Sequence, residues 1–141
     1  CTFYDALGKN DKDYLIARAI QFFCPGIPQV YYMGLLAGEN DMELLRKTKV
    51  GRDINRHYYG DEEIKGGLER DVVKSMIKIM KFRNNHPSFN GDFIIEKSDS
   101  DVLILTWVNG EFNSTLIVDF EEDLFRINYS DSKGTSMFEP F

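Results

Sequence analysis

One short apolar run limits what this chain can fold into. Residues 27–34, "IPQVYYMG", are mostly β-branched, aromatic or otherwise apolar and include Pro28 and Gly34 as boundaries, which is typical of a strand buried on both faces of a parallel sheet. Such a strand needs parallel neighbours, and no second run of this kind is visible before residue 88. One strand with its flanking helices cannot close a core. Residues 1–87 are therefore expected to be the last α/β unit of a longer protein, and the first residue, Cys1, agrees with a fragment.

Two helices are predicted on either side of this run. Residues 11–24 and 70–83 both place apolar side chains at three- and four-residue steps, which makes one buried face on each helix. Residues 35–60 between them show no long period, although "NDMELLRK" predicts a short helix capped by Asn40 or Asp41. A segment of this length in a compact domain is usually functional or disordered, and its arginines, tyrosines and histidine favour a functional loop.

The hydrophobic period changes from the helical to the strand period after about residue 88. Two alternating segments are joined by Asn109-Gly110, which is a strong signal for a β-hairpin. We therefore predict two regions, residues 1–87 from an α/β barrel and residues 88–141 as a small antiparallel β domain. The predicted strands lie in "FIIEKS", "DVLILTWV", "EFNSTLIVDF", "LFRINYS" and "TSMFEPF".

Composition excludes several classes of protein. The net charge of −6 argues against non-specific binding of nucleic acid, which requires positive charge against phosphate. No run of apolar residues is long enough to cross a membrane. The two cysteines are too few for a disulfide scaffold, and Cys24 lies within an apolar pattern, so we predict a reduced core thiol and a cytoplasmic protein.

A longer stretch of sequence carries a family resemblance. Residues 22–59, "FFCPGIPQVYYMGLLAGENDMELLRKTKVGRDINRHYY", resemble the sucrose phosphorylases of the α-amylase superfamily. The resemblance covers essentially the whole chain and weakens in the β region. It implies a (β/α)8 barrel in which residues 28–33 form the eighth strand and residues 70–83 the closing helix. Because barrel active sites lie at the carboxyl ends of the strands, loop 34–60 is expected to lie over the site.

The same resemblance implies roles for side chains of the loop. Arg52 falls on the arginine that holds the glucosyl unit of the donor, and a guanidinium offers a fixed fork of donors to adjacent hydroxyls. The alternative is a surface salt bridge from Arg52 to Asp53 or Asp41. Arg56 and His57 either order the loop or touch the substrate. The residues expected in the wall of the site are Asp53, Arg56, His57 and Tyr58.

No catalytic residue is expected within the chain. Retaining glucosyl transfer needs a nucleophile and an acid/base whose carboxyl groups lie about 5–5.5 Å apart. The resemblance places both on earlier strands, and Asp41 and Glu43 are spaced too closely on a helical turn to face each other. The chain alone is expected to be inactive, and neither a metal nor an organic cofactor is expected.

The function implied is reversible transfer of glucose from sucrose to phosphate, which gives α-glucose 1-phosphate and fructose. Sucrose 6'-phosphate and glucosylglycerate stay open as donors. The expected partners are the sugar, phosphate and the missing N-terminal barrel units, and the resemblance allows a homodimer. A rival hypothesis is a non-catalytic module that binds carbohydrate or protein through Trp107 and Tyr129 of the β region, and a third is that the chain does not fold alone.

Overall fold

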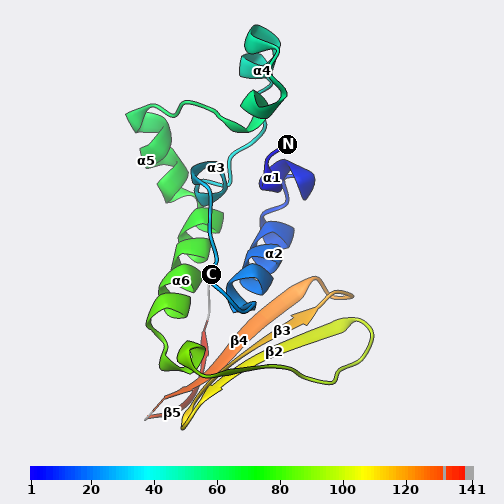
Figure 1. Cartoon of the computed structure of the whole chain (residues 1–141), viewed down its shortest axis with the longest axis vertical. Helices are drawn as coiled ribbons and strands as arrows, with labels where there is room; N and C mark the ends of the chain where they lie inside the picture. Colours follow the sequence, from blue (N-terminus) through cyan, green and yellow to red (C-terminus); the bar gives the residue numbers. More distant parts are fainter. Residues whose placement is uncertain (132, 139–141) are drawn as a thin grey trace.

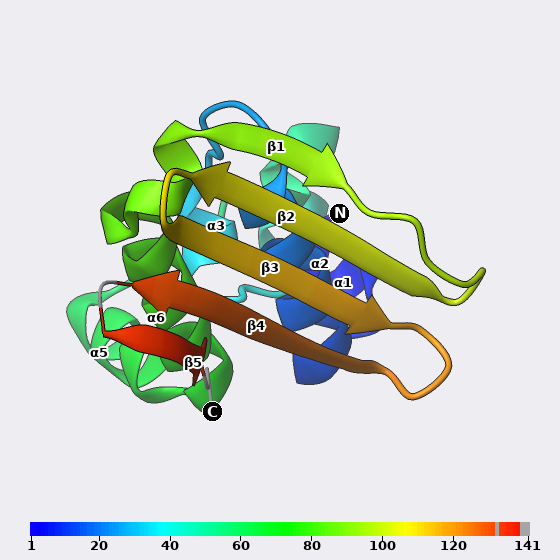
Figure 2. The ribbon, with the colours of Figure 1, turned by 90° about the horizontal axis from the view of Figure 1, so that it is seen from below.

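The computed structural model describes residues 1–131 and 133–138 as a layer of helices packed on one face of a β-sheet (Figures 1 and 2). The helix predicted over 11–24 is confirmed as α2, and Asn10 caps its start by accepting from the backbone N–H groups of Lys12 and Asp13. The helix predicted over 70–83 is confirmed as α6. The helical elements are α1 (Phe3–Ala6), α2 (Asp11–Phe23), α3 (Tyr32–Leu35), α4 (Met42–Thr48), η1 (Gly51–Asn55), α5 (Asp61–Glu69), α6 (Asp71–Asn85) and η2 (Pro87–Asn90).

The sheet is an antiparallel meander in which each strand pairs with the next along the chain. The predicted hairpin is confirmed one residue further on, because Asn109 pairs with Phe112 and leaves Gly110 and Glu111 as the turn. Gly110 supplies the left-handed backbone of this turn with a φ of 61°. The strands are β1 (Asp92–Ile95), β2 (Val102–Asn109), β3 (Phe112–Asp119), β4 (Leu124–Asp131) and β5 (Gly134–Phe138).

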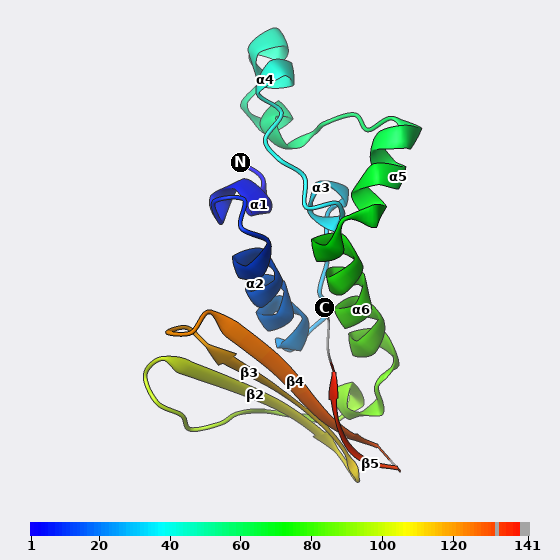
Figure 3. The same cartoon turned by 180° about the vertical axis from the view of Figure 1, so that it is seen from behind.

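One hydrophobic core joins the helices to the sheet. Alternate residues of the strands, such as Leu105, Leu116 and Ile127, are buried in the same cluster as residues of α2 and α6. The division of the chain at residue 87 stays a prediction, but residues on both sides of it share this core. Figure 3 shows α2 and α6 side by side above the sheet.

The C-terminal end of α2 is closed by side chains from other elements. The last carbonyl groups of a helix have no partner within the helix and need one elsewhere. The Arg83 side chain of α6 donates from Nε to the carbonyl of Phe22 at 2.8 Å, and the Trp107 indole of β2 donates to the carbonyl of Phe23 at 2.7 Å. The positive guanidinium also favours the negative end of the helix dipole. These contacts fix α2 to both α6 and the sheet.

The predicted strand over residues 27–34 is not formed within the described residues. Residues 27–31 belong to no helix or strand, and the following residues turn into α3. Ile27 is 91% exposed and Tyr31 and Tyr32 are also exposed, so the burial expected for this run is not provided by the described residues. The physical reason is that a parallel strand exists only with its neighbours, which these residues do not supply. Cys24, predicted in the core, is also exposed.

A test of the sheet's attachment comes from Gly91, between η2 and β1. A Cβ atom at this position would lie 1.9 Å from the carbonyl oxygen of Val108, which is backbone and cannot move aside cheaply. We expect Gly91→Ala to lower the free energy of unfolding by about 1–3 kcal/mol. The matched control is Gly66→Ala in α5, where a Cβ atom meets open space and should stabilise by about 0.5–1 kcal/mol. Urea denaturation followed by circular dichroism measures both, and equal midpoints for the two variants would contradict the expectation.

Candidate functional site

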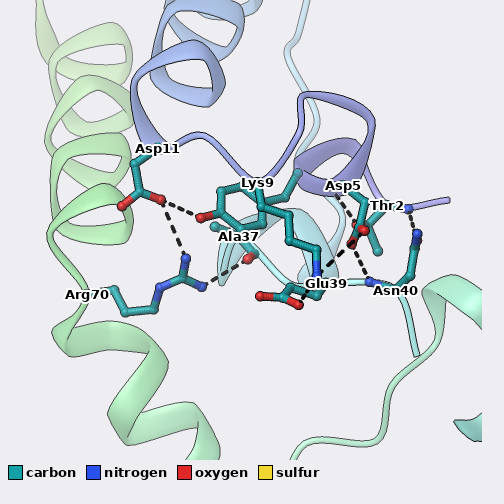
Figure 4. A network of polar contacts seen from close by, with 9 residues as sticks. Thr2, Asp5, Lys9, Asp11, Ala37, Glu39, Asn40 and Arg70 are labelled. Atoms are coloured by element: carbon teal, nitrogen blue, oxygen red, sulfur yellow. Dashed lines mark hydrogen bonds and ion pairs between the residues drawn. The ribbon is translucent and has the colours of Figure 1, made fainter. Parts of the chain in front are cut away.

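The segment that leads into the long loop is fastened to the N-terminal helix. The backbone N–H of Thr2 donates to the Asn40 side chain at 2.7 Å, and the backbone N–H of Asn40 donates to the Asp5 carboxylate at 2.6 Å (Figure 4). Lys9 and Glu39 form an ion pair beside them. The start of the loop is therefore held in place by contacts that involve its backbone.

Arg70 holds the same segment from the other side. Its Nη1 donates to the carbonyl groups of Leu36 and Ala37 at 3.0 and 2.9 Å, and its Nη2 lies 3.6 Å from the Asp11 carboxylate (Figure 4). Arg70 comes directly before α6, so it connects the loop's entry to a helix that contributes Val72, Val73 and Met76 to the core. Together with Asn40, it fixes the position from which the loop departs.

Asp41 closes the base of the loop. Its backbone N–H donates to the carbonyl of Ile54 at 2.8 Å, so the chain comes back to the start of the loop after the short helices α4 and η1. One carboxylate oxygen caps α4 by accepting from the N–H of Leu44 at 2.7 Å, which confirms Asp41 as the predicted cap. The other oxygen lies 2.6 Å from Nδ1 of His57.

His57 bridges two carboxylates. Its Nδ1 faces Asp41, and its Nε2 lies 3.0 Å from Oε1 of Glu63 in the first turn of α5. The hydrogen bond to Asp41, followed by that to Glu63, raises the pKa of His57 above its ordinary value. The pKa of Asp41 is lowered by the backbone N–H of Leu44 and then by His57. The pKa of Glu63 is lowered by the backbone N–H of Gly60 and then by His57.

Arg52 and Arg56 lie in or beside η1, and both are exposed. Within residues 1–131 and 133–138, neither guanidinium forms a hydrogen bond or an ion pair with a described residue. The alternative reading of Arg52, a salt bridge to Asp53 or Asp41, is therefore not formed, and Asp41 is occupied by His57. Figure 1 shows α4 and the adjoining loop standing away from the rest of the molecule. Arg52 is free to meet a group supplied from outside the described chain.

Tyr58 and His57 line a cavity of about 600 Å³ between α3 and α5. Tyr58 is 81% exposed, while Tyr59 packs edge-on against the His57 ring with centroids 4.7 Å apart. The Tyr32 hydroxyl donates to the carbonyl of His57 at 3.0 Å. The remaining lining is apolar and comes from Leu35, Leu36, Ile64 and Leu68.

The predicted site residues thus fall into two groups. Arg52, Asp53 and Arg56 lie together at η1, whereas His57 and Tyr58 border the cavity. Sequence reasoning missed Glu63 as the second partner of His57. The spacing of Glu63 three residues after Gly60 signals only its cap, in which it accepts from the backbone N–H of Gly60, and not its contact with His57.

No group of three or more His, Cys, Asp or Glu side chains in the described part of the chain is arranged to hold a metal ion. Among the same residues, none of the helices is both long and apolar enough to cross a membrane.

Comparison with known proteins shows which proteins the chain is similar to. No protein-family model matches it. The curated sucrose phosphorylase of Agrobacterium vitis is 61% identical over 123 residues, which are 86% of this chain and 25% of that protein. The chain is a homologue of the sucrose phosphorylases. It spans about a quarter of the length of the curated relatives it matches.

Phosphorylases named for substrates other than sucrose are also similar to the chain. The glucosylglycerol phosphorylase of Marinobacter adhaerens is 48% identical over 131 residues, 93% of this chain and 27% of that protein. The crystal structure of sucrose 6F-phosphate phosphorylase from Thermoanaerobacter thermosaccharolyticum superposes with a TM-score of 0.96 at 47% identity, and the match covers 98% of this chain and 28% of that one. The fold expected from the sequence, that of the C-terminal part of a sucrose phosphorylase, is confirmed.

Proposed function

We propose that the complete protein containing this chain is a retaining phosphorylase that transfers glucose from sucrose to phosphate and gives α-glucose 1-phosphate and fructose. The observation that supports it most directly is the 61% identity to a sucrose phosphorylase over 86% of the chain. An exposed Arg52 without a partner among the described residues is compatible with a donor to sugar hydroxyls. Sugar and phosphate are the small molecules of this proposal, and a cytoplasmic homodimer is the assembly.

In this proposal the chain supplies one wall of the site and the closure of a barrel. Residues 1–87 complete the barrel and residues 88–141 form the domain that follows it. Arg52 donates to the glucosyl unit in the donor subsite, while Asp53, Arg56, His57 and Tyr58 shape the wall around it. Residues 27–31, which belong to no helix or strand here, take up their strand pairing with the remaining barrel units.

The catalytic carboxyl groups are proposed to come from outside this chain. A retaining mechanism needs one carboxyl group that is protonated at working pH and a second that is free to attack the sugar. Asp41 and Glu63 do not suit these tasks: their lowered pKa values keep them ionised and unfit as the acid, and His57 engages an oxygen of each, so neither is free to attack a sugar. The isolated chain is therefore expected to show no phosphorolysis.

The rival hypothesis of a sugar-binding module loses its main support. Trp107 is only 7% exposed and its indole N–H is bonded to the carbonyl of Phe23, so its ring is not available to stack on a sugar. Tyr129 packs against Phe82 and His86, with ring centroids 5.2 and 5.3 Å apart. Both aromatic side chains serve the contact between sheet and helices.

The proposal is tested by the donor preference of the complete protein. Phosphate-dependent formation of a glucose 1-phosphate is measured with sucrose, sucrose 6'-phosphate, glucosylglycerate and glucosylglycerol at equal concentration. We expect the highest kcat/KM with sucrose. A higher value with another donor would move the assignment to that donor, and no phosphorolysis of any donor would overturn the proposal.

A further inference from the structure

The segment that carries Arg52 is held almost entirely at its base. We call residues 41–57 the Arg52 loop. Neither α4 nor η1, which make up most of it, contains a buried residue, so apolar packing within the described chain does not fix its position. Figure 3 shows the loop projecting beyond the ends of the long helices. What fixes it are the polar contacts at Asp41 and His57, where the two ends of the loop meet.

We propose that His57 is a positioning residue for Arg52: by bonding to Asp41 at one ring nitrogen and to Glu63 at the other, it ties the Arg52 loop to α5. This inference rests on the proposed role of Arg52. His57 itself touches no sugar in the proposal. Its effect on the reaction is to hold the guanidinium in the place where the donor binds.

The three side chains of this clamp, Asp41, His57 and Glu63, are each fixed by a further contact. Asp41 also caps α4 through Leu44, so the same carboxylate orients the helix of the loop and receives the imidazole. Glu63 accepts from the backbone N–H of Gly60 at 2.8 Å. Because both of its carboxylate partners are held by these further contacts, the His57 ring connects α4 to α5.

The ring of His57 is steadied by tyrosines. Tyr59 packs edge-on against it, and the Tyr32 hydroxyl donates to its carbonyl group. Tyr59 in turn lies so close to Gly38 that a Cβ atom there would meet the Tyr59 hydroxyl oxygen at 2.2 Å. Through Tyr59, the clamp is therefore packed against the fixed segment that precedes the loop.

The clamp depends on the charge of the imidazole. Both ring nitrogens donate a proton only in the imidazolium form, and a neutral ring can donate to one carboxylate alone. The acidic groups that face His57 are Asp41 and Glu63 in direct contact and Glu39 and Glu43 around the adjoining cavity of about 380 Å³. The neighbouring phenols do not titrate in the pH range of His57. Burial is the main cause: it raises the pKa of Tyr59 and raises that of Tyr32 to about 12.

The clamp should weaken as the pH rises. The pKa of His57 is raised above its ordinary value of 6.5, while the pKa values of Asp41 and Glu63 are lowered. The clamp is therefore complete from mildly acidic pH upward and loses one of its two bonds as the pH rises through the raised pKa of His57. The affinity for the sugar donor should weaken over that same interval.

The experiment replaces His57 in the complete protein. We expect His57→Gln to raise KM for sucrose roughly tenfold, as for a lost hydrogen bond between charged groups, with a much smaller change in kcat. The rise of KM with pH through the His57 pKa should disappear in this variant. Glu63→Gln, which leaves the bond to Asp41, should give a smaller rise in KM. The matched control is Glu62→Gln, because among the described residues Glu62 pairs only with the exposed Lys65, and its loss should leave KM unchanged.

A second measurement separates this inference from the role of Arg52. Hydrogen–deuterium exchange of the backbone amides of residues 42–57 is compared between wild type and His57→Gln at one pH. Faster exchange in the variant is expected whatever Arg52 binds. An unchanged KM, pH profile and exchange rate in His57→Gln would overturn the inference. If Arg52→Ala is fully active while the exchange still accelerates, the clamp stands and the proposed role of Arg52 fails.

Discussion

Arg52→Ala is expected to lower kcat/KM for sucrose phosphorolysis by the complete protein by about a hundredfold, the usual cost of removing one preorganised donor from a reacting centre. The guanidinium is exposed on η1 and forms no hydrogen bond or ion pair with the described residues that its loss could disturb. The fold should therefore stay intact. Steady-state kinetics at saturating phosphate measure the effect, and circular dichroism checks the fold.

Two further variants test whether the effect is specific to the guanidinium of Arg52. Arg52→Lys keeps the positive charge but not the planar fork, so it should recover only part of the lost rate. Arg46→Ala removes an exposed arginine from the last turn of α4 in the same loop and should leave kcat/KM close to wild type. If Arg52→Ala phosphorolyses sucrose at the wild-type rate, Arg52 does not contact the donor.

Trp107→Ala is expected to lower the free energy of unfolding of the chain by about 3–5 kcal/mol. The indole is almost fully buried and packs against Phe89 and Phe93, with ring centroids 5.8 and 5.2 Å away. Its removal leaves a cavity between the sheet and α2, and it also leaves the carbonyl of Phe23 without its donor. Urea unfolding followed by far-ultraviolet circular dichroism measures the loss.

The hydrogen bond and the packing at Trp107 can be separated. Trp107→Phe keeps an aromatic ring and removes the indole N–H, so it should cost about 1–3 kcal/mol, less than the alanine variant. Phe120→Ala, at a half-exposed aromatic residue after β3, should change stability by well under the cost of either. A Trp107→Ala variant as stable as Phe120→Ala would show that the sheet does not depend on this contact.

Local patterns in the sequence predicted the elements that local physics controls. The periodic apolar positions of α2 and α6, the capping side chain of Asp41 and the turn around Gly110 all follow from neighbours within a few residues. The strand expected over residues 27–34 stays a prediction, because a parallel strand depends on partners that the described residues do not supply, and without them Tyr31 and Tyr32 are exposed. Residues 61–69, for which no element was predicted, form the helix α5 despite their two glycines.

The candidate site shows the same limit. The length and residue types of the loop indicated where a site would lie, and Arg52 is carried as a prediction from the family resemblance. The bond from His57 to Asp41 joins residues 16 positions apart, and no helical or strand period relates them. Only the fold brings Asp41, His57 and Glu63 together, so the clamp could not be read from spacing.

The bond from Trp107 to Phe23 has a consequence for the order of events during synthesis. The two residues are 84 positions apart, so the carbonyl of Phe23 at the end of α2 cannot accept the indole hydrogen bond until Trp107 of β2 has been synthesised. At about 5–20 residues per second, translation of the intervening chain takes on the order of ten seconds. During that interval the apolar face of α2 has emerged while the sheet that covers it has not. A nascent chain stalled before residue 107 should therefore recruit chaperones at this helix, and release of the chaperone should coincide with emergence of β2 and β3.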